Sequence, residues 1–249
     1  MGKQIVQWIG HGSWKMITPE GTVIYLDPWI KGNPASKISI EDTRDAQVVI
    51  VTHGHDDHLG NAIEICKNTG AVLVTLPDIM IYVDKYYGIP YDTGGGAIHV
   101  GGTIRMKDLV IHCVHAEHYS NIWGAEYQKD KTIMPGSGCS GMVVECRGGK
   151  TVYFAGDTGV FGDMSLISEL YSPYLSILPV GGKYVMEPYE AAKAAELLKS
   201  PVIIPGHYNT FPAITQDMKQ LQELVAKKAP RTKVVVLQPS DIFEVPTGG

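Results

Sequence analysis

The chain has 249 residues, 44% of them apolar, so it can bury a sizeable core and has the length of one layered domain. Its formal net charge is −5 and its only adjacent lysines are Lys227 and Lys228, which argues against a nucleic acid partner. No apolar run approaches the roughly 18 to 20 residues of a membrane span and no export signal is recognisable, so we expect no membrane association and a cytoplasmic location.

Apolar strands and turns alternate in the first third of the chain. Strand patterns are predicted at residues 3–10, 13–18, 22–27, 46–52 and 71–76. A helix is predicted at residues 60–68, ended by Gly70, and another from Pro77 to about Tyr87, with proline near its start.

The rest of the chain follows a similar order. After a glycine-rich stretch at 93–102, strands are predicted at residues 109–116, 141–147, 151–157, 174–180, 201–206 and 233–238. Helices are predicted near residues 163–170, 188–200 and 213–228. A long polar loop at 117–140 exceeds a simple connection, and we expect it to form a lid or pocket wall.

Two segments echo each other. "GTVIYLD" ends at Asp27 and "KTVYFAGD" ends at Asp157, and strands alternating with helices follow each of them. This predicts two similar halves, whose sheets meet face to face with amphipathic helices outside. We therefore expect an α/β (α+β) fold, a four-layer αββα sandwich. Because no low-complexity linker interrupts the chain, we expect one domain over residues 1–249.

The stretch "VIVTHGHDDHLGN" at 49–61 concentrates metal-binding side chains at a strand-to-helix junction. His53, His55, Asp57 and His58 can converge there from a strand end, a turn and a helix start, while Asp56 is expected to be exposed or capping. Imidazole and carboxylate together suit zinc, iron, nickel or manganese. The alternative is a solvated loop with a capping aspartate, but four such residues within six positions favour a metal site.

More ligands are needed to close a dinuclear site, and other apolar strands end on suitable residues. His115, Asp157 and His207 each follow such a strand, where α/β folds place their chemistry. The four cysteines have unrelated spacings and no CxxC pair, so they are interpreted as buried thiols: Cys66, Cys113, Cys139 and Cys146.

This pattern, His-x-His-x-Asp-His followed by isolated His, Asp and His, resembles the metallo-β-lactamase superfamily over essentially the whole chain. More narrowly, "GHGSWKM", "YLDPW", "THGHDDHLGN", "YFAGDT", "ILPVGG" and "PGHYNTFP" resemble a cytosolic family of metal-dependent hydrolases related to ascorbate-6-phosphate lactonases.

The resemblance implies a site with two divalent metal ions, zinc first, with manganese, iron or nickel as the other candidates. It places one ion on His53, His55 and His115, the other on Asp57, His58 and His207, and makes Asp157 the bridge. A water between the ions would become a nucleophile at neutral pH, and Asp57 would be the catalytic residue that orients it and accepts its proton.

Five further residues are expected around the metals. The resemblance gives Asp27 a supporting role through hydrogen bonds to ligands; the alternative is an ordinary turn aspartate. It puts His11 at the pocket edge or behind the ligands; the alternative is a packed or solvated histidine. We expect His118 to line the pocket or the surface rather than to protonate a leaving group. Tyr208 and Asn209, which follow His207, are candidates for polar contacts with the substrate.

The leading interpretation is a hydrolase whose substrate is a small molecule, an ester, lactone or phosphoester. The sequence leaves open whether the protein forms a homo-oligomer. A phosphodiesterase or nuclease of the same superfamily is the first alternative, although the acidic chain lacks a basic stripe. A diiron redox enzyme is disfavoured because acid-rich sites suit redox iron better than this histidine-rich motif. The alternative outside catalysis is a protein that binds metal without turnover.

Overall fold

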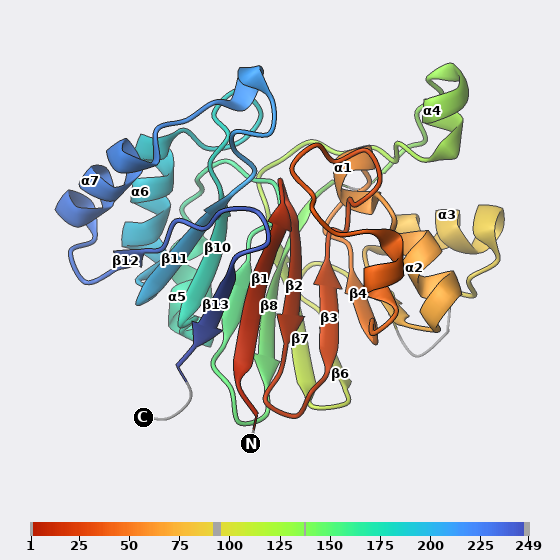
Figure 1. Ribbon diagram of the computed structural model, residues 1–249, viewed down its shortest axis with the longest axis horizontal. Helices are drawn as coiled ribbons and strands as arrows, with labels where there is room; N and C mark the ends of the chain where they lie inside the picture. The colour runs from red at the N-terminus through yellow and green to blue at the C-terminus, as the bar shows by residue number, and fades with distance from the viewer. Residues whose placement is uncertain (1, 92–95, 137, 247–249) are drawn as a thin grey trace.

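The computed structural model describes residues 2–91, 96–136 and 138–246, and in it two β-sheets pack face to face with helices on both outer sides (Figure 1). The expected αββα sandwich is confirmed. The first sheet has the order β13 (Ile242–Val245), β1 (Gln4–Gly10), β2 (Ser13–Ile17), β3 (Val23–Leu26), β4 (Val48–Ile50) and β5 (Val72–Val74). The second sheet has the order β12 (Lys233–Val234), β11 (Val202–Gly206), β10 (Leu175–Pro179), β9 (Val152–Phe154), β8 (Ser140–Cys146), β7 (Leu109–His115) and β6 (Thr103–Met106).

The two sheets repeat one connectivity, as the sequence echo predicts. In the first sheet β3 pairs antiparallel with β2 and parallel with β4. In the second, β9 pairs antiparallel with β8 and parallel with β10. Asp27 and Asp157 therefore follow equivalent strands of the two halves, and both lie at the end of the sandwich where the parallel strands finish.

Helices cover the two outer faces of the sandwich. They are α1 (Asp56–Leu59), α2 (Ala62–Thr69), α3 (Pro77–Tyr87), α4 (Ala125–Asp130), α5 (Met164–Tyr171), α6 (Pro188–Leu198) and α7 (Met218–Lys228), with 3₁₀ turns at Ile40–Thr43 and Pro212–Ile214. Figure 1 shows α5, α6 and α7 on one side of the sheets and α2 and α3 on the other. None of the helices in the described ranges is long and apolar enough to cross a membrane.

One apolar core fills the space between the sheets and a second lies under α5–α7. Trp14 and Ile50 of the first sheet share the inner core with Ile111 and Met142 of the second. The next residue along β8, Val143, points outward and packs in the second core, because side chains of a strand alternate between faces. Every described residue of β4 is buried, as expected for a parallel strand covered on both faces.

The predicted and observed elements differ at several places, among them the helix α4 inside the predicted loop at 117–140. The last predicted helix begins later, at Met218, because the side chain of Asp217 accepts a hydrogen bond from the Lys219 N–H and caps it there. Strand β12 is only two residues long, and the sequence analysis does not include the edge strands β6 and β13. Part of the glycine-rich stretch at 93–102 lies outside the described residues.

Candidate metal centre

Histidine and aspartate side chains gather at the end of the sandwich where β4, β9 and β11 finish. Three of these residues have left-handed backbone angles, with φ of 56° at His11, 45° at Asp27 and 56° at His207. Such angles cost a residue with a Cβ roughly 1–2 kcal/mol. Backbone strain of this kind is concentrated at functional sites, where the surrounding structure holds it in place.

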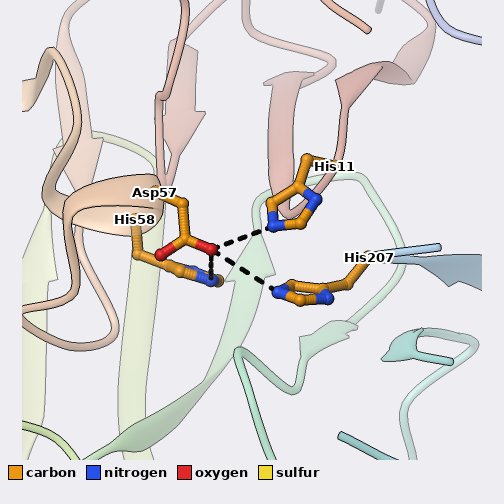
Figure 2. A group of neighbouring side chains, drawn as sticks. All are labelled: His11, Asp57, His58 and His207. Carbon is orange, nitrogen blue, oxygen red and sulfur yellow. Dashed lines mark hydrogen bonds and ion pairs between the residues drawn. The ribbon is translucent and has the colours of Figure 1, made fainter. Parts of the chain in front are cut away.

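The first group of side chains surrounds Asp57, as Figure 2 shows. Its Oδ2 atom lies 2.9 Å from His11 Nε2, 3.8 Å from His58 Nε2 and 3.7 Å from His207 Nε2. Because an ionised carboxylate only accepts hydrogen bonds, His11 Nε2 carries a hydrogen and donates a hydrogen bond to Asp57. The other ring nitrogen of His11 lies 2.9 Å from the hydroxyl of Thr210, which can donate to it.

The second group consists of His53, His55 and His118. His53 Nε2 lies 3.0 Å from His55 Nδ1, and the His118 ring lies 5.4 Å from the His53 ring and 5.3 Å from the His55 ring, measured between centroids. Three imidazoles whose nitrogens converge in this way form a ligand set suited to zinc and other first-row metals.

Asp157 joins the two groups. Its Oδ2 atom lies 3.3 Å from His58 Nε2, 3.3 Å from His207 Nε2 and 3.8 Å from His118 Nε2. Asp27 also lies near one histidine of each group, His53 and His58, but it meets His58 at Nδ1, the ring nitrogen opposite the one that faces Asp157. One carboxylate oxygen thus lies between imidazole nitrogens of the two groups.

The structure corrects the expectation for His115. Its side chain is 54% exposed and faces Glu117 and Phe161, away from both groups. The side chain next to His53 and His55 is that of His118, which the sequence analysis places at the pocket wall or surface. The reason is that β7 ends at His115, and the following loop folds back over the His-Gly-His turn before it presents an imidazole.

Two hydrogen bonds and a close contact fix that loop on the turn. The N–H of Gly54 donates to the hydroxyl of Ser120, and the N–H of Trp123 donates to the carbonyl of Gly54. A Cβ at Gly54 would lie 2.7 Å from the carbonyl oxygen of Asn121, so only glycine allows this approach. The expected pocket wall from loop 117–140 is thus present near Trp123, whose ring lies 4.4 Å from that of His55; residue 137 lies outside the described residues.

Asp27 fixes the orientation of one ligand from each group. Its carboxylate accepts hydrogen bonds from Thr52 N–H at 2.7 Å, Thr52 Oγ1 at 2.6 Å and His58 Nδ1 at 2.8 Å. Since the Thr52 hydroxyl donates to Asp27, it accepts from His53 Nδ1, 3.0 Å away. Thr52 and Asp27 thus hold the Nδ1 atoms of His53 and His58, so the Nε2 atom of each ring faces the centre, as in metal-bound histidines supported by a carboxylate.

We predict that Asp27→Asn lowers metal affinity by about 10- to 100-fold. Asparagine tolerates the left-handed backbone, but its amide cannot accept from both Thr52 and His58, so the proton of His58 can shift to the nitrogen that faces the centre. Competition with a chelator measures the affinity. Asp45→Asn serves as a matched control, since Asp45 is exposed and its side chain contacts Lys15 and Tyr25, away from the metal centre. Equal affinities in the two variants would show that Asp27 plays no supporting role.

The charges and unpaired atoms of the centre fit a cation. Burial lowers the pKa of His11 and of His55 to about 4, so both rings are neutral. For His207, burial is outweighed by the nearby carboxylates, chiefly Asp157, which raise its pKa to about 9. Burial opposes ionisation of Asp157, but the charges of His207 and His58 hold its pKa well below the usual range.

Several polar atoms at the centre have no hydrogen-bond partner among the described residues: His58 Nε2, His207 Nε2, His207 Nδ1 and Asp157 Oδ1. An unpaired buried polar atom costs on the order of 1–3 kcal/mol. A cluster of such atoms therefore requires an explanation. The two Nε2 atoms face Asp157 and its neighbours and are placed as ligands. The histidine and aspartate residues therefore fit a metal site.

The remaining site expectations turn out differently. Tyr208 is buried in the core, where it stacks on Trp8 and its hydroxyl donates to the carbonyl of Leu237, so it cannot contact a substrate. Asn209 accepts a hydrogen bond from the Gln216 N–H and stabilises its own loop. Both residues follow His207 in sequence, but the left-handed turn there directs their side chains elsewhere.

Three further residues support the centre, and two of them, Thr52 and Thr210, are not among the residues predicted from the sequence. Thr52 transmits the hydrogen bonding of Asp27 to His53, Thr210 supports His11, and Trp123 covers one face of His55. Thr52 and Thr210 are each close in sequence to a predicted ligand, and that adjacency is the one signal that could have drawn attention to them. Trp123 lies in the loop at 117–140 that is expected to form a lid or pocket wall, and the fold of that loop brings its ring to His55.

Comparison with known proteins identifies the family of the chain. A family model described as a β-lactamase superfamily domain matches residues 5–207. A UPF0173 metal-dependent hydrolase of Methanopyrus kandleri is 40% identical over 244 residues, which cover 96% of this chain and 99% of that protein. Another of Methanosphaera stadtmanae is 37% identical over 240 residues, covering 96% and 98%.

A solved structure is similar over the whole chain as well. It is a metallo hydrolase from the hyperthermophilic archaeon Ignicoccus hospitalis, with 33% sequence identity and a TM-score of 0.78, covering 98% of this chain and 100% of the other. The similarity therefore includes both sheets and all of the segments that carry the histidine and aspartate groups.

Proposed function

The chain belongs to the β-lactamase superfamily and is a metal-dependent hydrolase of its UPF0173 group, and from this premise we propose that it cleaves a small ester, lactone or phosphoester at a dinuclear metal site. The observation that carries the proposal is the position of Asp157. Its Oδ2 atom lies within 3.3–3.8 Å of histidine nitrogens from both ligand groups. One carboxylate between two sets of imidazoles is the arrangement that two adjacent ions require.

We assign the ligands by group. One ion would be held by His53, His55 and His118, the other by Asp57, His58 and His207, with Asp157 shared between them. Zinc is our first choice because the set is rich in imidazole, and manganese, iron and nickel are the other candidates. When bound, such ions polarise the oxygen of the scissile bond and lower the pKa of a water so that it acts as a nucleophile at neutral pH.

The protein's own groups perform the proton handling and positioning. Asp57 is the most accessible carboxylate of the centre, with a side chain 27% exposed compared with 5% for Asp157, so it is the group able to accept a proton from the attacking water. His11 donates a hydrogen bond to Asp57 Oδ2 and holds the carboxylate in place. The 16% exposed side chain of His118 marks the same open side, and the substrate enters there.

Metal binding is expected to stabilise the fold measurably. At a free zinc concentration 100 times the dissociation constant, linkage gives about 2.7 kcal/mol. For a chain of this length that corresponds to a rise in Tm of roughly 5 to 10 °C over the chelator-treated protein. Differential scanning calorimetry, with elemental analysis of the same sample, measures both quantities.

The same preparation tests the function itself. The metal-replete protein should hold about two ions per chain and turn over at least one member of a panel of 4-nitrophenyl esters, γ-lactones and phosphodiesters, and chelation should abolish that turnover. A protein that binds metal with the expected rise in Tm but cleaves nothing in the panel would be a metal-binding protein without hydrolysis of these classes. One ion per chain would contradict the dinuclear assignment.

A further inference from the structure

A groove of about 650 Å³ lies beside the metal centre, between the loop that follows β3, the helices α1 and α2, and the end of α3. This is the size of a small-molecule pocket. The metal ligands do not line it, so it is not the metal site itself. The short helix α1 separates the two, with Asp57 and His58 directed to the centre and Asp56 and Leu59 lining the groove.

Two tryptophans connect the groove with the centre. Trp123 lines the groove and lies with its ring 4.4 Å from that of His55. Trp29 lines it as well, and its ring meets the edge of His11 at 5.3 Å. A molecule in the groove would therefore contact the same two side chains that cover the histidines of the centre. The groove is placed to hold a part of the substrate that lies next to the bond being cleaved.

The groove combines aromatic and aliphatic side chains with polar ones, Asn61 and Asn68 among them, and the formal charges of its lining sum to zero. Leu59, Ile63 and Tyr87 add apolar and aromatic surface to that of the two tryptophans. Among the described residues that line it, the charged ones are two lysines and two acids: Lys31, Lys67, Asp56 and Glu64.

Both lysines of the groove already interact with neighbouring side chains, so neither is placed to bind a phosphate. Lys31 forms an ion pair with Glu64, and the Nζ atom of Lys67 lies 5.5 Å from the centre of the Tyr87 ring. A phosphate group is usually met by arginine or lysine clusters or by a helix N-terminus with free amides. The charge balance thus favours an uncharged ligand, and the aromatic walls favour an apolar one.

We propose that this groove binds the apolar acyl chain of an uncharged carboxylic ester or lactone. This inference rests on the proposed function and narrows it to carboxylic acid derivatives. In the reaction the oxygen of water bonds to the acyl carbon, the bond from that carbon to the alcohol oxygen breaks, and the alcohol oxygen takes up a proton. The products are a carboxylic acid, whose chain lies in the groove, and an alcohol, or one hydroxy acid from a lactone.

The test is a chain-length series of 4-nitrophenyl esters from acetate to octanoate with the metal-replete protein. Each methylene that enters the groove should raise kcat/KM by about fourfold until the groove is full. Asn68→Trp places a large side chain in the groove from an exposed position of α2 and should lower kcat/KM for the octanoate by about 10-fold or more while changing that for the acetate less than about twofold. Gln222→Trp, exposed on α7 and outside the groove, is the matched control and should behave as the native protein.

A binding measurement separates this inference from the proposed function. Calorimetry with octanamide, an uncharged compound with the same chain, should show binding to the native protein and to Gln222→Trp, and weaker binding to Asn68→Trp. Ile63→Ala, which shortens an apolar wall, should weaken it about 5- to 10-fold and covers the case in which Asn68→Trp fails to fold.

Each combination of results has one meaning. Octanamide binding that Asn68→Trp weakens, without hydrolysis of any ester, would support the groove as an apolar site and overturn the hydrolase proposal. Ester hydrolysis that is independent of chain length, or unaffected by Asn68→Trp and Ile63→Ala, would overturn the groove and leave the hydrolase. A preference for 4-nitrophenyl phosphate over every carboxylic ester would overturn the inference of an uncharged substrate.

Discussion

Replacing Asp157 with alanine should reduce the metal content from about two ions per chain to one or none and lower kcat/KM for any substrate of the native protein by about 10³-fold or more. Asp157 is the carboxylate between the two ligand groups, 97% removed from solvent, with Oδ2 3.3 Å from both His58 Nε2 and His207 Nε2. A metal contributes several kcal/mol of charge stabilisation in the transition state, and about 4 kcal/mol corresponds to the loss of rate given above.

The structure also predicts what else changes in this variant. Without Asp157 the imidazoles of His58 and His207 lose the carboxylate that contributes most to raising their pKa, so the metal-free protein becomes less able to hold them protonated. The rise in Tm on adding zinc should shrink with the metal content. Asp163→Ala is the matched control, because Asp163 is exposed at the start of α5. A variant that still holds two ions per chain would show that Asp157 is not the bridge.

The convergence of most site residues could be predicted from sequence because strand ends locate them. His53, Asp157 and His207 each follow a buried strand, and parallel strands of one sandwich end at the same edge, so residues far apart in sequence meet there. The supporting position of Asp27 follows from the same rule, since β3 and β9 are equivalent strands of the two halves. Strand position carries this information without any knowledge of the loops.

Loop geometry limits the rest. His118 belongs to a loop whose path depends on Ser120 and Trp123 binding the backbone of Gly54, contacts that no local pattern encodes. Tyr208 and Asn209 follow a ligand directly, but the φ of 56° at His207 turns them away. The strand β13 is short and has exposed residues, so only its pairing with β1, distant in sequence, makes it a strand. These features are set by tertiary contacts rather than by residue pattern.

His118→Ala and His115→Ala should have opposite outcomes, although the two residues are three positions apart. His118 lies with His53 and His55, and its Nε2 atom is 3.8 Å from Asp157 Oδ2. Its loss removes one of three imidazoles from the first ion. We expect His118→Ala to hold about one ion per chain and to lose at least about 10²-fold in kcat/KM, on the order of a lost transition-state contact.

His115→Ala, by contrast, should keep both ions and stay within about twofold of native turnover. The His115 side chain is 54% exposed, and its contacts are Glu117 and the ring of Phe161, so its removal should change the free energy of unfolding by no more than about 0.5 kcal/mol. Elemental analysis and steady-state kinetics on the two variants decide between the ligand sets. If His115→Ala lost an ion and His118→Ala did not, His115 would be the ligand. The loop that follows β7 would then have to move when metal binds, so that His115 takes the place of His118 beside His53 and His55. The hydrogen bonds that Gly54 donates to Ser120 and accepts from Trp123 oppose such a movement, which is why we expect the first outcome.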